Sequence, residues 1–159
     1  MRTLSFTLAW LLLAGWVSAN AQDKTTDLAI VVGKGCTFDG FTSAELVKIF
    51  RGEKSKDPDG HHFVLVGMAN HTPEFSAILA GVYNLDEDGY AKYFLQATFT
   101  AVVAVPPRQF TSSTALRQFV ATTTGAISYL RASDADDSVK VLKVDGKLPG
   151  EPGYRLKIK

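Results

Sequence analysis

The sequence contains a single cysteine, Cys36, so no disulfide bond can form within the chain. A lone cysteine also excludes a dithiol redox pair and a zinc site built from several thiolates. We therefore expect Cys36 to be a small, buried, mostly apolar side chain rather than a reactive thiol.

The sequence also lacks an excess of either sign of charge. Its 159 residues include 17 Lys and Arg against 16 Asp and Glu. Removing residues 1–21 takes away only Arg2 among the charged residues, which leaves equal numbers of basic and acidic residues. Because nucleic-acid binding and membrane-surface binding both depend on a basic excess, the composition argues against both functions.

Catalytic and nucleotide-binding motifs are absent. The sequence has no G-x-S-x-G elbow, no H-E-x-x-H pair and no phosphate-binding P-loop. His61 and His62 are adjacent in a polar turn, so their side chains are expected to diverge. A metal site would need His71 or a carboxylate such as Asp57 or Asp59 to join them. We therefore expect no enzymatic activity, no cofactor and no bound metal.

The one long apolar run stands at the start of the chain. It covers Leu4–Val17, follows a basic residue and precedes the small-x-small triplet Ala19–Ala21. This order is typical of a secretory signal peptide, which is predicted over residues 1–21. A membrane anchor would need about 20 apolar residues, and Trp16 stands where a lipoprotein would carry its cysteine. The protein is expected to be exported, soluble after signal cleavage and not a lipoprotein.

Residues 22–27 are interpreted as a polar leader and residues 28–159 as one domain. In this domain, apolar strand patterns alternate with helical patterns, which favours an α/β fold with a mainly parallel sheet. Strands are predicted over Leu28–Val32, Phe63–Met68, Phe99–Val105, Ala126–Leu130 and Val139–Val144, with a closing strand over Tyr154–Ile158. Helix starts are predicted at Thr42, which has Glu45 three residues later, at Thr72, at Asp86, and at Ser112 or Ser113.

Two of these helix starts follow strands and are rich in polar side chains. They comprise Asn70, His71 and Thr72 at one helix, and Ser112, Ser113 and Thr114 at the other. Free N–H groups and the helix dipole suit such ends to anions, and ligands of open α/β sheets bind beyond the carboxyl ends of strands. The loop with Gly33 and Thr37 is expected nearby, and His71 would add positive charge below about pH 6.5. Ordinary helix capping explains the same hydroxyl groups without a ligand, so both interpretations stay open.

Three motifs occur in a recognisable order. Residues 41–52, FTSAELVKIFRG, are similar to an l-s-x-x-e-L-x-x-I-F-x-G helix, Asp59-Gly60 leads into the next strand, and residues 125–130, GAISYL, are similar to a G-A-I-G-Y-v strand. The region from Leu28 to Val144 thus resembles the short members of the phosphate-transporter substrate-binding (PstS-like) family. This resemblance implies a three-layer periplasmic-binding-protein-like fold of type 2, present as a single or reduced lobe. It also implies a periplasmic, non-enzymatic protein that binds solutes.

The resemblance further implies a phosphate or other oxyanion ligand for an ABC-type uptake system. The family's R-a-D-G-S-G-T stretch corresponds to Met68–Ser76, where the arginine and glycine are missing and Glu74 would repel an anion. Each charge-assisted bond lost with that arginine is worth about 1.5–3 kcal/mol. The alternative is a periplasmic interaction or sensory module without a ligand. Such a module would dock on a membrane transporter or sensor, or form a homodimer.

Overall fold

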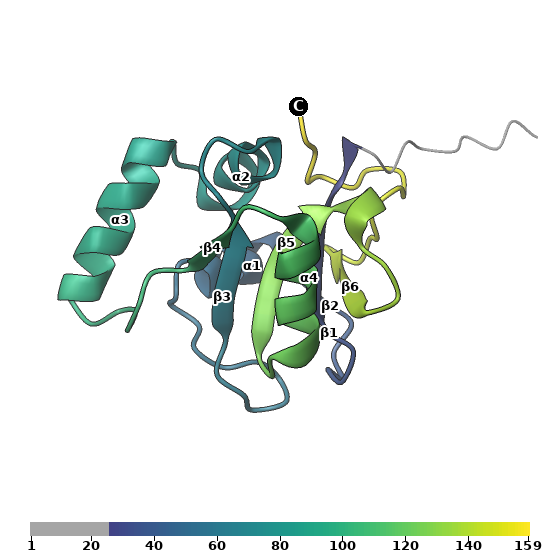
Figure 1. The fold of residues 1–159 in the computed structure, drawn as a ribbon, viewed down its shortest axis with the longest axis horizontal. Helices are drawn as coiled ribbons and strands as arrows, with labels where there is room; N and C mark the ends of the chain where they lie inside the picture. Colours follow the sequence, from purple (N-terminus) through teal and green to yellow (C-terminus); the bar gives the residue numbers. More distant parts are fainter. Residues whose placement is uncertain (1–25) are drawn as a thin grey trace, which may run out of the picture.

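A computed structural model describes residues 26–159 (Figure 1). The predicted signal peptide and residues 22–25 of the predicted leader lie outside the described residues. Asp27, the last residue of that leader, is fully buried and forms a β-bridge with Lys157. The fold therefore includes the last residue of the segment that the sequence marked as polar.

Among the described residues, six strands form one sheet in the order β2-β6-β1-β5-β3-β4. The strands are β1 (Leu28–Gly33), β2 (Gly40–Phe41), β3 (Val64–Met68), β4 (Arg108–Phe110), β5 (Ala126–Arg131) and β6 (Val139–Val144). The pairs β2–β6, β5–β3 and β3–β4 are parallel, whereas β1 is antiparallel to both β5 and β6. The prediction of a mainly parallel sheet is confirmed. The exception is β1, which runs antiparallel to both of its neighbours.

Helices cover both faces of the sheet, which gives the three layers that were predicted (Figure 1). They are α1 (Ser43–Phe50), α2 (Pro73–Ile78) with its π-helical continuation η2 (Leu79–Tyr83), α3 (Glu87–Phe99), α4 (Ser113–Thr122) and the short η3 (Ala132–Asp134). In Figure 1, α4 lies in front of β5 and β1, α1 lies behind the sheet, and α3 stands at the side of the molecule. The π-helical turn η2 packs against α1.

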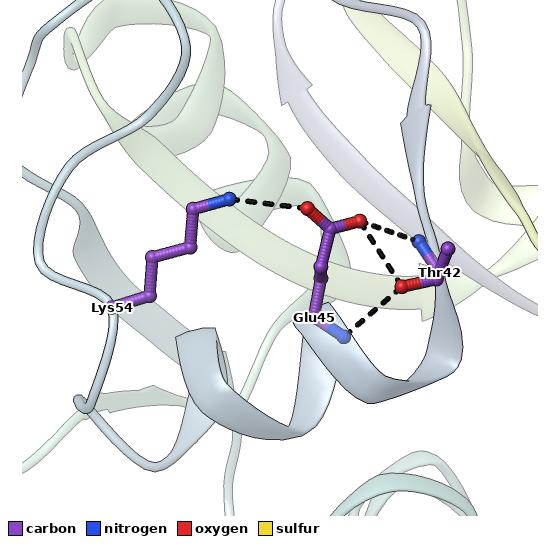
Figure 2. A network of polar contacts seen from close by, with 3 residues as sticks. All are labelled: Thr42, Glu45 and Lys54. Atoms are coloured by element: carbon purple, nitrogen blue, oxygen red, sulfur yellow. Dashed lines mark hydrogen bonds and ion pairs between the residues drawn. The ribbon is translucent and has the colours of Figure 1, made fainter.

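The predicted start of α1 is confirmed in detail (Figure 2). The Thr42 hydroxyl accepts a hydrogen bond from the Glu45 N–H at 3.2 Å, and the Glu45 carboxylate accepts one from the Thr42 N–H at 3.0 Å. Lys54 adds an ion pair to Glu45 at 3.3 Å. A cap of this kind stabilises a helix by about 1 kcal/mol. The predicted caps of the other long helices are confirmed as well, at Thr72, Asp86 and Ser112.

The predicted strand over Phe99–Val105 is wrong. Helix α3 continues to Phe99, and the edge strand that pairs with β3 on the side away from β5 is Arg108–Phe110. Because Phe94 and Ala97 are buried, they hold this end of α3 against the core. Of the β-branched residues that follow, Val103 is buried against the core, whereas Val102 and Val105 are 47% and 75% exposed. The predicted closing strand is likewise reduced to the single bridge of Lys157 with Asp27.

Candidate functional site

The carboxyl ends of β3 and β4 bring one group of predicted site residues together. The two strands are parallel neighbours, with Met68 opposite Phe110. Residues 70–72 follow β3 and residues 112–114 follow β4, so both helix starts lie at the same edge of the sheet. The Asn70 side-chain oxygen accepts a hydrogen bond from the Gln109 amide at 2.6 Å, which joins the first segment to strand β4. We call residues 70–72 and 112–114 the carboxyl-edge site.

Two hydroxyl groups of the carboxyl-edge site take part in helix capping. Thr72 Oγ1 accepts from the Phe75 N–H at 3.2 Å and donates to the Ala69 carbonyl at 2.8 Å. Ser112 Oγ accepts from the Ala115 N–H at 3.4 Å. Ser113 and Thr114 belong to the first turn of α4, where N–H groups have no carbonyl partner within the helix. The groups best placed for a solute are therefore at the start of α4.

Charges at this edge are compensated within the protein. Glu74, in the first turn of α2, lies 2.8 Å from the guanidinium group of Arg131. Glu87 Oε2 lies 3.0 Å from His71 Nδ1, and its other oxygen accepts from the His71 N–H at 3.1 Å. Glu74 thus faces a cation, which offsets the repulsion expected from the sequence. Sequence reasoning missed Arg131, although its position at the carboxyl end of β5 follows the same rule that selected residues 70–72.

Gly33 and Thr37 lie at the opposite edge of the sheet, and the expectation that they join the other site residues is wrong. Strand β1 is antiparallel to β5, with Val32 opposite Ile127. The end of β1 therefore lies where β5 and β3 begin, since those two strands are parallel. The direction of β1 is the physical reason for the separation.

A hollow of about 410 Å³ lies at this opposite edge, which we call the amino edge because β3 and β5 begin there. Gly33 lines the hollow, and Thr37 follows its lining residue Cys36 in the chain. The hollow is lined by residues 33–36, Asp59, His61 and residues 121–125. Thr37 donates from its N–H to Asp59 Oδ2 at 2.9 Å and from its hydroxyl group to Oδ1. Cys36 is half-buried here rather than enclosed in the core. Burial, and then the nearby Asp57 and Asp59, raise the pKa of its thiol.

A larger hollow, of about 580 Å³, has an apolar lining that includes Ile49, Val64, Val103 and Phe119. The Arg108 guanidinium group at its rim lies 4.9 Å and 5.1 Å from the ring centres of Phe110 and Phe119. Four large apolar residues on α3 and on the segment after it are exposed, and two of them, Val102 and Val105, line this hollow. Leu95, Phe99, Val102 and Val105 are 62%, 83%, 47% and 75% exposed, and we call them the apolar strip.

Among the described residues, no helix has the length and apolar character that a membrane span requires.

Several solved structures have the same fold as this chain. A phosphate transport receptor from Vibrio cholerae matches with a TM-score of 0.63 and 17% identity, over 78% of this chain and 48% of that chain. A second structure, from Clostridium perfringens, contains bound phosphate and is assigned to the substrate-binding proteins of phosphate ABC transporters. It matches with a TM-score of 0.66 and 19% identity, over 83% of this chain and 52% of that chain. PstS from Borrelia burgdorferi matches with a TM-score of 0.65 and 14% identity, over 84% of this chain and 55% of that chain.

These matches confirm the predicted periplasmic-binding-protein-like fold, and at such identities they show the fold alone. The chain spans about half the length of the solved proteins that it matches. No protein-family model matches the sequence, and comparison with curated proteins gives no match.

Proposed function

We propose that this protein is an exported solute-binding domain that holds a small oxyanion or polar solute at the carboxyl-edge site, for an ABC-type uptake system. The observation that carries the proposal is the convergence of residues 70–72 and 112–114 at the ends of two neighbouring parallel strands. The fold supports it, because a protein of this fold has been solved with bound phosphate. Binding at helix N-termini needs no catalytic group or cofactor.

The charges of the site narrow the solute class. Arg131 is engaged by Glu74, and Glu87 faces His71. A dianion would find little uncompensated positive charge at this edge, whereas a neutral polar solute or a singly charged oxyanion needs only hydrogen-bond donors. We therefore propose that singly charged and neutral solutes are preferred over phosphate dianion.

Thermal unfolding of the purified protein, with and without phosphate, sulfate, nitrate and small polar solutes, tests this function. A solute present at 100 times its Kd stabilises the folded protein by about 2.7 kcal/mol. Ser113→Ala and Thr114→Val remove hydroxyl groups from the first turn of α4 without changing its cap, Ser112. Both variants are expected to reduce the stabilisation by the solute.

Thr122→Val is the matched control, because it removes a hydroxyl group from the other end of α4. That hydroxyl group donates to the Gln118 carbonyl within the helix at 2.9 Å. The control is expected to keep the full stabilisation by the solute. A protein that unfolds cooperatively and responds to no solute would contradict the proposal.

The apolar strip favours a second candidate, an interaction module. Single exposed apolar residues are common on protein surfaces, whereas large apolar patches mark binding surfaces, and these four exposed residues all fall within residues 95–105. We propose a second copy of this chain as the occupant, since two chains together have about the length of one of the matched proteins. A membrane transporter or sensor on the same strip is the competing outcome, and the oligomeric state of the purified protein distinguishes the two.

A further inference from the structure

Metal-ligating side chains gather at the amino edge of the sheet, away from the carboxyl-edge site. Cys36, Asp57 and Asp59 each offer one ligand atom, and these three atoms all lie within 4.8 Å of one another. His61 lies beside this group of three, and its Nδ1 is 3.4 Å from Asp57 Oδ2. Cys36 comes from the loop after β1, and the other three residues come from the turn that precedes β3.

One oxygen of the buried Asp57 carboxylate makes no hydrogen bond within the part of the chain that the structure describes. The Asp57 side chain is 1% exposed, and its Oδ1 accepts a hydrogen bond from the His61 N–H at 2.8 Å. Its Oδ2 makes no hydrogen bond with any described residue. Burying a charged oxygen without a donor or a cation is strongly unfavourable. His61 Nδ1, 3.4 Å from this oxygen, is a cation only when it is protonated. Beside a neutral imidazole, the oxygen therefore points to a ligand that carries positive charge.

We propose that Cys36, Asp57, Asp59 and His61 bind a divalent transition-metal ion of the zinc class. Thiolate, imidazole and carboxylate are the groups that coordinate zinc in proteins. In a tetrahedral site with metal–ligand distances of 2.0–2.3 Å, neighbouring ligand atoms are about 3.3–3.7 Å apart. The Asp57–His61 separation of 3.4 Å already has this value. On binding, Cys36 releases its thiol proton to solvent, and His61 coordinates through the lone pair of neutral Nδ1.

Contacts around the four residues hold the donors in place. Both oxygens of Asp59 accept hydrogen bonds from Thr37. The Asp57 N–H donates to the His61 carbonyl at 2.9 Å, which closes the turn between them. Such outer contacts orient ligands and raise metal affinity. The hollow of about 410 Å³ beside Cys36, Asp59 and His61 gives an ion access from solvent.

The positive charge of the nearby Lys140 favours a site with three anionic ligands. A thiolate and two carboxylates leave one negative charge when a divalent ion binds. Lys140 Nζ donates to the Cys36 carbonyl at 3.1 Å and pairs with Asp39 at 2.8 Å. The ammonium group therefore lies beside the site and reduces its remaining negative charge.

Titration of the purified protein, prepared without a histidine tag, tests the proposal. Zn²⁺ is followed by calorimetry and Co²⁺ by absorbance, because a Co²⁺–thiolate bond gives a charge-transfer band in the near ultraviolet. We expect one ion per chain and a band that Cys36→Ser removes. His61→Ala is expected to lower the affinity about tenfold or more.

His62→Ala is the matched control. It removes the adjacent imidazole, which lines the apolar hollow instead of the metal-ligand cluster. Both the Zn²⁺ affinity and the Co²⁺ band are expected to stay unchanged in this variant. If Cys36→Ser fails to fold, Asp57→Asn serves in its place, because it keeps an acceptor for the His61 N–H while removing the charge. The proposal is overturned by a folded protein that shows no saturable Zn²⁺ binding, or by binding that depends equally on His61 and His62.

Discussion

Glu74 and Arg131 connect the first turn of α2 to the end of β5. Glu74 Oε1 lies 2.8 Å from a terminal guanidinium nitrogen and accepts a hydrogen bond from Nε at 3.0 Å. The Glu74 side chain is only 12% exposed, so solvent screens this pair weakly. The carboxylate therefore cancels a positive charge that an anion at the carboxyl-edge site would otherwise use.

Glu74→Gln is expected to increase the affinity for a bound oxyanion by about tenfold, since one negative charge is removed close to the site. The variant is also expected to lower the free energy of unfolding by about 1–3 kcal/mol, because Arg131 loses its charged partner. Calorimetric titration with sulfate and with phosphate measures the first effect. Glu53→Gln, on an exposed loop, makes the same change in net charge and serves as the control. Equal effects of both variants would mean that net charge alone is responsible.

Local signals predicted the helix starts well, because a cap depends on residues three positions apart. Thr42, Thr72, Asp86 and Ser112 each accept a hydrogen bond from the expected N–H group. The residues over 99–105 show the limit of such signals. Their β-branched composition favours a strand, but whether they are buried depends on distant parts of the chain that the local pattern does not contain.

The position of the candidate site residues in the fold was predictable in part. Residues 70–72 and 112–114 follow strands, and the rule that places ligands at carboxyl ends of parallel strands selected them together. Gly33 failed the same test because the antiparallel direction of β1 has no local sequence signal. The proximity of Cys36 to Asp57 is also a long-range consequence of the fold. For this reason the sequence, with one cysteine, led to the expectation of no metal.

Asp27 anchors the first strand to the end of the chain. Its carboxylate is fully buried, accepts from the Gly150 N–H at 2.6 Å and pairs with Lys157. Asp27→Ala is expected to lower the free energy of unfolding by about 2–4 kcal/mol, because a buried N–H and an ammonium group lose their partner. Urea unfolding measures the change. Asp137→Asn, at an exposed position, is the control, and a loss below about 1 kcal/mol for Asp27→Ala would show that the contact is replaceable.

Asp145 makes the stability of the protein depend on pH. Its carboxylate accepts hydrogen bonds from the Ser43 hydroxyl and, at 2.8 Å, from the Ser43 N–H in the first turn of α1. These bonds lower the pKa of the carboxyl group below its usual 3.8. A lowered pKa in the folded state contributes stability above the usual pKa, and this stability is lost as pH falls through the lowered value. Asp145→Asn is therefore expected to destabilise the protein at pH 7 and to destabilise it less at pH 2. Urea unfolding at both pH values checks this, and an equal loss at both would contradict it.

Gly125 occupies a position that only glycine fits. Its φ is +78°, and a Cβ atom there would collide with the His62 carbonyl oxygen. Gly125→Ala is expected to lower the free energy of unfolding by about 3 kcal/mol or more, because backbone strain and the collision act together. Gly60→Ala isolates the strain, because Gly60 has a φ of +90° but open space around it. The Gly60→Ala variant is expected to lower the free energy of unfolding by about 1–2 kcal/mol. Equal losses in thermal or urea unfolding would show that the carbonyl group moves aside.

Phe99 is the most exposed large apolar residue of the described chain, at 83%, and belongs to the apolar strip. If a second copy covers the apolar strip, the purified protein is expected to sediment as a dimer at micromolar concentration. Phe99→Glu would place two charges in the desolvated interface and shift the protein to monomer, by an affinity loss of about 100-fold or more. Ser76→Glu adds the same charge at an exposed position on α2 and is expected to leave the dimer intact. A wild-type protein that stays monomeric would leave the strip to a different protein, such as a membrane transporter or sensor.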